Sequence, residues 1–383
     1  MFLFIVFKPH FVYIIGKKTF SYKAKGGYLM AKMNRLTKIK IEGYKSFRQI
    51  ELEIKNVNIM IGENGAGKSN LMSVFDLLKA IREYELQGYV NLQGGMNSLL
   101  YNGWKQTRDC YLEIVRDRYM FYGRISANNA DTCFLSQQGA YDLKEGHNLY
   151  VTDGFRELKD DGIVKKLRLL DDIGVYHFHD TSVTSLMKAN CDINDNIELA
   201  PDGRNIAAIL YRIKQNNPDT YQYIVGMVQL AAPYFKDFVL RMNPLKGGKI
   251  RLEWSKRECD IPFGAEHLSD GTLRFICIVT LLCLPEEMRK DVICIDEPEL
   301  GLHPSAITVI IELMKKYAEE RQIIVATQSV EIVDAFEPGD IVVVDNCAGE
   351  SMFHRLDEAE LEDWLEDYTV GELWKKNIIG GRP

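Results

Sequence analysis

The segment Gly62–Ser69, "GENGAGKS", constrains the fold more than any other part of the chain. It follows the apolar run "VNIMI" and precedes "NLMSVFDLLKAIREY", whose apolar residues fall at helical spacing. The segment matches the pattern G-x-x-x-x-G-K-[ST], in which glycines let successive backbone N–H groups point inward. Because the start of the helix adds its positive end, this loop can hold phosphates. The sequence therefore predicts a strand, a phosphate-binding loop (P-loop) and a helix in an α/β fold.

The residue types in this loop predict its ligands. We expect Lys68 to reach the outer phosphates of ATP and Ser69 to offer its hydroxyl to Mg²⁺. ATP and Mg²⁺ are therefore the expected cofactors. The expected nucleotide-binding residues are Gly62, Glu63, Asn64, Gly65, Ala66, Gly67, Lys68, Ser69 and Asn70.

The stretch "ICIDEP" is an apolar strand that ends in two acids. We expect Asp296 to lie beside the P-loop and to hold the hydration shell of Mg²⁺. Glu297 is then placed to polarise the attacking water as a general base. Acids that only cap a helix are also common after an apolar run, but the following "PELGLHP" favours the catalytic interpretation.

The stretch "LSDGTLR" runs directly into an apolar helix and allows two interpretations. Ser269 or Asp270 can cap the helix. Alternatively, the same helix start, with the bare Gly271, receives a phosphate held by a different subunit. A cap and an anion site share one geometry, so the local sequence does not separate the two.

Apolar patterning along the chain predicts the fold class. "LTKIKIEGYKSFRQIELEI" reads as two half-buried strands, and residues 111–125 read as a hairpin that turns near Asp117. Strands and helices alternate after residue 262, which is typical of a largely parallel sheet. We predict a P-loop α/β fold with a mixed N-terminal β lobe, a largely parallel core sheet and a helical insert.

The domain boundaries follow from these changes of pattern. We expect an N-terminal half of the ATPase, a helical insert, a C-terminal half with the other motifs, and a tail. Residues 1–32 are expected to be an upstream extension from a misplaced start codon, or alternatively an added strand or hydrophobic anchor. The expected ranges are 1–32, 33–175, 176–261, 262–345 and 346–383.

Composition limits the cellular setting. The net charge of -7 argues against a uniformly basic protein that coats nucleic acid, although a local basic patch is compatible with it. The eight cysteines are scattered without a C-x-x-C pair, which favours reduced thiols. Lys8, Pro9 and His10 interrupt the apolar N-terminal run, so no continuous membrane span is expected there. We therefore expect a cytoplasmic protein with no membrane partner.

The order of these motifs resembles that of ABC-type ATPases, and in detail their SMC/RecF-like branch. Within it, the chain is similar to stand-alone bacterial AAA family ATPases related to the ATPase part of OLD-family nucleases. The resemblance implies a head-to-tail homodimer that encloses two ATP molecules, with Ser269, Asp270 and Gly271 at the partner's γ-phosphate. The resembling segments are "IEGYKSFRQIELEI", "IGENGAGKSNL", "YHFHDTS", "LSDGTLRFICIVTLL", "IDEPELGLHP", "IVATQS" and "GELWKKNIIGGRP".

Gln328 in "VATQS" stands where many such ATPases place a histidine that faces the terminal phosphate. Its amide can donate a hydrogen bond, but unlike imidazole it exchanges no proton near neutral pH. We therefore predict slow hydrolysis with no histidine-like step in its pH profile from this position. The alternative is that Gln328 caps the following helix, with Thr327 or Ser329 sharing that role.

Other positions depart from the family pattern or stay open. The signature lacks the second glycine and the glutamine of the transporter pattern. The glutamine of the loop between the two lobes is not identifiable, and Gln93, Gln137 and Gln138 are its unranked candidates. Lys45 and Arg48 either contact nucleotide or are solvated.

Two further segments have open roles. His177 and His179 would point the same way on an extended strand, so they form part of a metal site or serve a structural or interface role. The acidic stretch "LDEAELEDWLEDY" predicts a solvated helix with Leu361 and Trp364 inward. A docking surface for a partner is the alternative for that helix.

The leading hypothesis for function is an ATP-hydrolysing, ATP-dimerised switch. Its expected output is control of an effector protein from a neighbouring gene, such as a nuclease, in anti-phage or mobile-element defence. The alternative is a DNA-binding ATPase in DNA repair or chromosome maintenance. The nucleotide-binding subunit of a transporter is a third class, which the DNA-linked character of "DEPELGLHP" and "LSDGT" disfavours.

Overall fold

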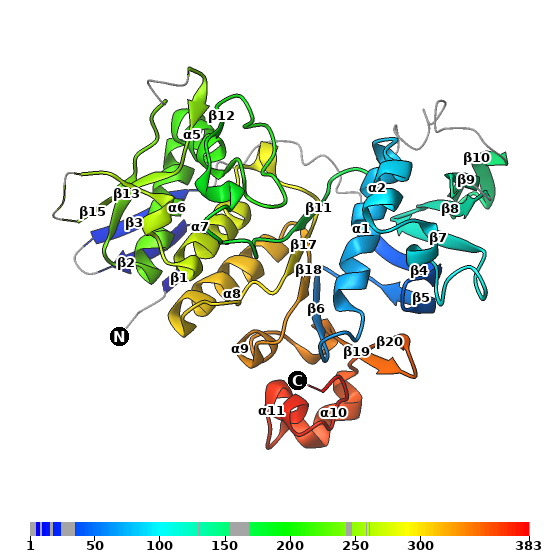
Figure 1. The fold of residues 1–383 in the computed structure, drawn as a ribbon. Coiled ribbons are helices and arrows are strands. Elements are labelled where there is room, and N and C mark those ends of the chain that lie inside the picture. Colours follow the sequence, from blue (N-terminus) through cyan, green and yellow to red (C-terminus); the bar gives the residue numbers. More distant parts are fainter. Residues whose placement is uncertain are drawn as a thin grey trace.

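The computed structural model of the chain describes residues 5–7, 10–15, 18–23, 35–128, 131–153, 168–242, 247–257, 259 and 261–382. Two six-stranded sheets form the centre of the molecule, and helices pack around them (Figure 1). A small helix-rich part covers one side, and the C-terminal helices lie below the core sheet in this view. The predicted fold class is confirmed.

The core sheet has the strand order β11-β17-β18-β6-β19-β20. Its strands are parallel except for the last pair, β19 with β20. Helices cover both of its faces, which explains why its inner strands are continuous apolar runs rich in Val and Ile. The strands are β6 (Val57–Ile61), β11 (Ile173–Tyr176), β17 (Val292–Asp296), β18 (Gln322–Ala326), β19 (Ile341–Cys347) and β20 (Glu350–Arg355).

The N-terminal lobe contains the second sheet, with the order β10-β9-β8-β7-β4-β5. Each of its described pairings is antiparallel, and β5 alternates buried and exposed residues as its sequence predicts. The predicted hairpin is confirmed, since Asp117 lies in the turn between β7 and β8. The strands are β4 (Leu36–Tyr44), β5 (Phe47–Glu53), β7 (Asp109–Arg116), β8 (Tyr119–Ala127), β9 (Cys133–Asp142) and β10 (His147–Asp153).

Two apolar cores lie on opposite faces of the core sheet. Helix α1 (Lys68–Arg82) is buried between the core sheet and the lobe sheet, together with the short helices α2 (Leu86–Leu92) and α3 (Met96–Leu99). Helices α7 (Asp270–Leu282) and α8 (Pro304–Ala318) cover the other face, with the short α9 (Val330–Val333) at its edge. The helix that follows the P-loop is therefore fixed from both sides.

The predicted helical insert, residues 176–261, contains helices and short strands. Helices α5 (Ile206–Asn216) and α6 (Pro218–Ala231) lie where apolar spacing predicts them. Besides these helices, the insert contains a small sheet beside α6, in which aromatic residues such as Phe235 and Trp254 stack. The boundaries stay a prediction. The short elements are η1 (Leu186–Lys188), β12 (Cys191–Asp192), β13 (Phe235–Phe238), β14 (Lys249–Ile250), β15 (Glu253–Lys256), β16 (Phe263–Gly264) and η2 (Ala265–His267).

Both ends of the described chain contribute secondary structure. Strands β1 (Ile5–Phe7), β2 (His10–Ile15) and β3 (Lys18–Lys23) form a separate antiparallel sheet. The misplaced start codon stays a prediction, and residues 1–4, 8–9, 16–17 and 24–32 of that range lie outside the described residues. The remaining elements are η3 (Glu286–Met288), η4 (Pro338–Asp340), α10 (Glu358–Leu365) and α11 (Val370–Lys375).

Helix α10 differs in one respect from its predicted orientation. Leu361 is buried as expected, but the prediction that Trp364 points inward is wrong, because its side chain is 44% exposed. The ring instead lies along the helix beside Tyr368, with 6.2 Å between the ring centroids. The indole therefore contacts this neighbour at i+4 and stays partly in solvent.

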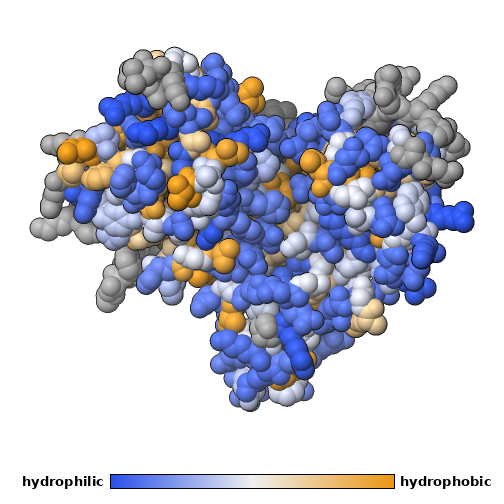
Figure 2. Space-filling view, viewed as in Figure 1, coloured by the Kyte–Doolittle hydropathy of each residue, from blue (hydrophilic) through white to orange (hydrophobic). Residues whose placement is uncertain are grey.

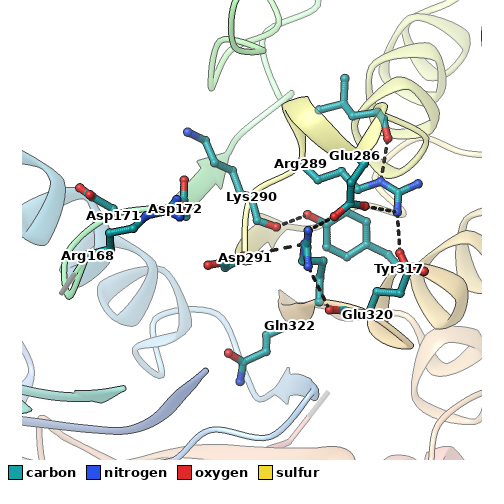
Figure 3. Close-up of polar contacts among 12 residues, drawn as sticks. Arg168, Asp171, Asp172, Glu286, Arg289, Lys290, Asp291, Tyr317, Glu320 and Gln322 are labelled. Atoms are coloured by element: carbon teal, nitrogen blue, oxygen red, sulfur yellow. Dashed lines mark hydrogen bonds and ion pairs between the residues drawn. The ribbon is translucent and has the colours of Figure 1, made fainter. Parts of the chain in front are cut away.

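Polar side chains gather around the amino ends of β17 and β18 (Figure 3). Gln322, which is buried, accepts a hydrogen bond from the Leu36 N–H at 2.8 Å and donates to the Leu36 and Lys55 carbonyls at 2.7 and 3.2 Å. Nearby, Tyr317 donates to the Lys290 carbonyl, and Arg289 pairs with Glu320. This end of the sheet lies opposite the strand ends that lead into the P-loop, Glu297 and Gln328. The hydrogen bonds between Gln322 and Leu36 therefore anchor the lobe at the far end of the sheet.

The surface carries no single dominant apolar face in the view of Figure 2. Apolar side chains there form small separated groups among polar ones, and a notch separates the two upper parts of the molecule. Within the ranges that the structure describes, no helix is long and apolar enough to span a membrane.

Replacement of Gln322 tests the anchoring of the lobe. In Gln322→Leu, buried backbone groups of Leu36 and Lys55 lose their partners, so we expect a loss of about 3 kcal/mol in the free energy of unfolding. Denaturant unfolding measures it. Gln49→Leu, at an exposed position on β5, is the control, and equal stability of the two variants would contradict the anchoring role.

Candidate nucleotide site

Three motifs that are far apart in the sequence meet at one edge of the core sheet. Strands β17, β18 and β6 are parallel neighbours, so the residues after each strand lie side by side. The hydroxyl of Ser69 lies 3.4 Å from the Asp296 carboxylate. The side-chain amide of Gln328 donates to the Glu297 carboxylate at 2.6 Å and to the Asn64 side chain at 2.9 Å. The fold thus brings together the predicted P-loop, acidic pair and glutamine.

The P-loop surrounds the amino group of Lys68, which is buried. That group donates to the Gly62 carbonyl and, at 3.0 Å, to the Glu63 carbonyl. Burial lowers the pKa of Lys68, while the nearby Glu297 carboxylate opposes this shift. Helix α1 begins here with Gly67 as its N-cap and with no side-chain cap, so its first N–H groups remain available to an anion.

Ser69 and Asp296 form the predicted magnesium position. A hydroxyl and a carboxylate are oxygen ligands of the kind that Mg²⁺ prefers, and Mg²⁺ takes its other ligands from water and phosphate. Burial raises the pKa of Asp296, with His177 opposing that shift, so a cation here would favour the charged carboxylate. Among the described residues no group of three or more His, Cys, Asp or Glu side chains is arranged to hold a metal. The two oxygens therefore fit a magnesium ion shared with a nucleotide.

Glu297 follows β17 in an unusual backbone conformation. Its φ of 45° lies in the left-handed region, which non-glycine residues adopt mainly at functional or strained positions. Its N–H donates to the Ala326 carbonyl at 2.8 Å, which ties the turn to β18. This geometry turns the carboxylate toward Gln328 and the P-loop, and the role of general base stays a prediction.

Gln328 does not cap the helix that follows it. The N-cap of α9 is Ser329, whose hydroxyl accepts from the Ile332 N–H at 3.3 Å. The Gln328 side chain instead bridges Glu297 and Asn64. The alternative in which Gln328 itself caps this helix does not describe the structure, and its role as a phosphate sensor stays a prediction.

Glu299 is a residue of this region that the sequence reasoning missed. One of its carboxylate oxygens accepts from the Thr327 hydroxyl and from the Gln328 N–H, both at 2.7 Å. The other oxygen is buried and has no hydrogen-bond partner in the part of the chain that the structure describes. Burial raises the pKa of this carboxyl. The only sequence signal was a third acid in "DEPEL".

The signature segment shows the predicted cap. Ser269 is the N-cap of α7, and its hydroxyl accepts from the Thr272 N–H at 3.1 Å. Asp270 is mostly exposed, with Lys188 3.6 Å away. Gly271 packs so closely on the Gly301 carbonyl that a β-carbon there would overlap it. Contact with a partner's phosphate stays a prediction, since cap and anion site share this geometry.

His177 and His179 lie beside the acidic strand end. Tyr176 pairs with Ile295 in the parallel register, so the next residues, His177 and Asp296, lie alongside each other. His177 Nδ1 is 3.8 Å from the Asp296 carboxylate, and His179 Nε2 is 3.0 Å from the Asp296 carbonyl oxygen. These contacts place the pair around Asp296, a proximity that follows from the pairing of β11 with β17 and that the sequence alone could not predict.

The candidates for the remaining glutamine differ in position. Gln93 accepts from the Lys45 amino group at 3.2 Å, and Lys45 also donates to Ser73 on α1 at 3.0 Å. Gln137 and Gln138 lie on β9 of the lobe sheet. Burial lowers the pKa of Lys45, whereas Arg48 is exposed on β5. Gln93 is thus the candidate connected to the P-loop helix, and its role stays a prediction.

The chain belongs to a family of AAA domain ATPases. Residues 140–334, slightly more than half of the chain, match the family described as "AAA domain, putative AbiEii toxin, Type IV TA system". Residues 35–99, which include the P-loop, match the family described as "AAA ATPase domain". No curated protein matches the chain.

Solved structures of SMC head domains share the fold. An SMC head bound to the C-terminal winged-helix domain of ScpA has a TM-score of 0.52 and 15% identity, covering 85% of this chain and 99% of that chain. The Pyrococcus furiosus SMC head, bound to the C-terminal domain of ScpA, has a TM-score of 0.51 and 13% identity, covering 87% and 98%. The Pyrococcus yayanosii SMC head has a TM-score of 0.50 and 11% identity, covering 87% of this chain and 99% of that chain. The predicted resemblance is confirmed at the level of the fold, which this chain shares with SMC heads.

The buried carboxyl of Glu299 predicts a distinctive dependence of stability on pH. Because its pKa is raised in the folded state, its favourable contribution is present below the unfolded value of about 4.3 and is lost as pH rises through the folded value. Glu299→Gln has no carboxyl to ionise at this position, so its stability does not fall in this way as pH rises. We therefore expect the stability of the variant relative to the wild type to rise between pH 4 and pH 7.

Glu331→Gln is the matched control, measured by thermal unfolding at the same pH values. The Ser329 hydroxyl lowers the pKa of Glu331, whose contribution is present above the unfolded value and is lost as pH falls. Its relative stability should therefore change with pH in the opposite direction. Slopes of the same sign for both variants would contradict the assignment of Glu299 as a desolvated carboxyl.

Proposed function

We propose that the protein is a slow ATPase that uses ATP to close a head-to-tail homodimer and thereby switches a partner protein. The observation that carries this proposal is the bridge from Gln328 to Glu297 and Asn64. It links the candidate base, the P-loop and the switch strand β18 through one amide.

The geometry supports a proposed role for each side chain. The P-loop N–H groups and Lys68 bind the phosphates, and Glu297 accepts the proton of the attacking water. Gln328 donates to Glu297 before nucleotide binds, so its amide must reorient to donate to a γ-phosphate. Arrival of that phosphate would then free the Glu297 carboxylate to bind water. Ser69 and Asp296 would hold Mg²⁺, which neutralises phosphate charge when bound.

The signature segment supports closure of a dimer. Its helix α7 begins at an exposed turn where Ser269, Asp270 and Gly271 are presented together. These residues would contact the γ-phosphate bound by a second subunit, since a helix N-terminus favours negative charge. Each ATP would then require residues of both subunits.

A protein effector is the proposed output. The description of the matched family names an AbiEii toxin and a type IV toxin–antitoxin system, which supports a role in defence. Two of the similar SMC heads were solved with a bound domain of ScpA, which supports regulation through a protein partner. DNA engagement in repair is the competing output.

Steady-state ATP turnover tests the base. Glu297→Gln removes the proton acceptor, so we expect turnover to fall about 100-fold or more while ATP binding persists. Glu312→Gln, at an exposed position on α8, should leave turnover unchanged. Equal turnover by Glu297→Gln and the wild type would rule out this assignment.

The pH profile of turnover tests the position of Gln328. Gln328→His places a group with an ordinary pKa of about 6.5 at the γ-phosphate. We expect this variant to gain a step in kcat near that pH relative to the wild type, and Gln328→Ala to lose both turnover and ATP-driven dimerisation. Unaltered turnover and dimerisation in Gln328→Ala would remove Gln328 from the site.

A pull-down identifies the output. Glu297→Gln trapped with ATP should form a dimer by light scattering and should retain an effector protein, which mass spectrometry would identify. Lys68→Ala, which should not bind nucleotide, is the control. Recovery of DNA without protein would favour the repair output, and recovery of neither would contradict both.

A further inference from the structure

The C-terminal residues 370–382, here called the C-terminal clamp, connect two parts of the candidate site. The clamp consists of helix α11 and the following turn "NIIGGR". A capping box between Thr369 and Glu372 fixes the start of the helix. In Figure 1 the C-terminal end lies close to α9 and to the tip of β6, the strand that leads into the P-loop.

One end of the clamp holds the helix that follows Gln328. The Gly371 N–H donates to the Asp334 carboxylate, just after α9, at 2.6 Å. A β-carbon at Gly371 would lie 2.5 Å from Val330 Cγ1 and 2.7 Å from Asp334 Oδ1. Since Val330 begins α9 two residues after Gln328, only glycine permits this close packing behind the switch.

The other end holds the entry to the P-loop. The Gly381 N–H donates to the Asp345 carboxylate at 2.7 Å, and its carbonyl accepts from the Trp374 indole. A β-carbon at Gly381 would lie 2.7 Å from Val343 Cγ1 and 3.4 Å from the Cα of Gly62. The carbonyl of Gly62 is the acceptor for Lys68. Gly381 therefore lies directly behind the first residue of the P-loop.

The part between the two ends is packed into the apolar core. Leu373 and Trp374 are fully buried, and Ile379 belongs to the same apolar core as Ile61 and Val343. The Ile378 N–H donates to the Leu373 carbonyl at 3.0 Å, which closes the turn after α11. Displacement of either end is thus transmitted through a packed unit rather than absorbed by a free loop.

We infer that the C-terminal clamp sets the spacing between the P-loop and the switch glutamine, with Gly381 positioning the P-loop and Gly371 positioning Gln328. This inference rests on the proposed function, because it concerns how the same site reads its nucleotide. Both glycines lie outside the P-loop and the switch residue and would act through them, so both are positioning residues.

The two ends predict different kinetic signatures. The P-loop binds the diphosphate that ADP and ATP share, so a side chain at Gly381 should weaken both ligands equally. Gln328 is aimed at the γ-phosphate, so a side chain at Gly371 should change turnover and leave ADP binding intact. If the glycines only stabilised the fold, each substitution would lower nucleotide affinity and turnover together.

The experiment compares Gly381→Val and Gly371→Ala with matched glycine variants in the full-length protein. Gly349 has a left-handed backbone like Gly381, and Gly226 is helical like Gly371, but a β-carbon at either meets open space. Affinities for fluorescent ADP and ATP, kcat and the melting temperature are measured for wild type, the clamp variants, Gly349→Val and Gly226→Ala.

We expect Gly381→Val to raise the Kd of ADP and ATP alike about tenfold, with a smaller effect on kcat at saturation. Gly371→Ala should lower kcat about tenfold and leave the ADP Kd within about twofold, as for a small misplacement of a reacting group. Gly349→Val and Gly226→Ala should match the wild type. Gly381→Ala serves as the milder variant if Gly381→Val does not fold.

Two outcomes would overturn the inference. One is that Gly381→Val or Gly381→Ala binds both nucleotides as Gly349→Val does. The other is that each clamp variant loses affinity and turnover only in proportion to its unfolded fraction. Failure of the wild type to bind nucleotide would instead contradict the proposed function, so the two failures are distinguishable.

Discussion

Parallel pairing of β17, β18 and β6 is the constraint on which the candidate site depends. In this register Asp296 lies beside Ala326, and Ala326 beside Met60, so three loops leave the sheet at one level. No disulfide or described metal cluster supports this edge. The positions of Glu297, Gln328 and Lys68 relative to one another therefore come from backbone hydrogen bonds and from the two apolar cores on either face of the sheet.

Those cores keep charged groups in a partly dry environment. Burial lowers the pKa of Lys68 and raises the pKa values of Asp296 and Glu299, which means that each charge is unfavourable without a partner. A nucleotide would supply negative charge to Lys68, and its cation would supply positive charge to Asp296. The ligand would then compensate the unfavourable free energy of these buried charges, which the fold imposes before binding.

The sequence was sufficient for the elements with strong local signals. The P-loop, the apolar strands of the core sheet and the hairpin at Asp117 each follow from residue patterns that act over fewer than about twenty residues. Contacts set by strand order were not predictable in this way, including those of His177 and His179 with Asp296. The small sheet around Trp254 and the exposed face of Trp364 were also missed, since both depend on which aromatic neighbour the tertiary fold supplies.

The two family matches, residues 35–99 and 140–334, do not correspond to two independent folding units. Strand β6 belongs to the first and lies between β18 and β19 in the core sheet, and Leu36 bonds to Gln322, 286 residues away. A nascent chain thus carries a finished P-loop sequence long before its neighbouring strands emerge. Its unpaired edges would be exposed to aggregation during that interval, so fragments of this ATPase are poor candidates for separate expression.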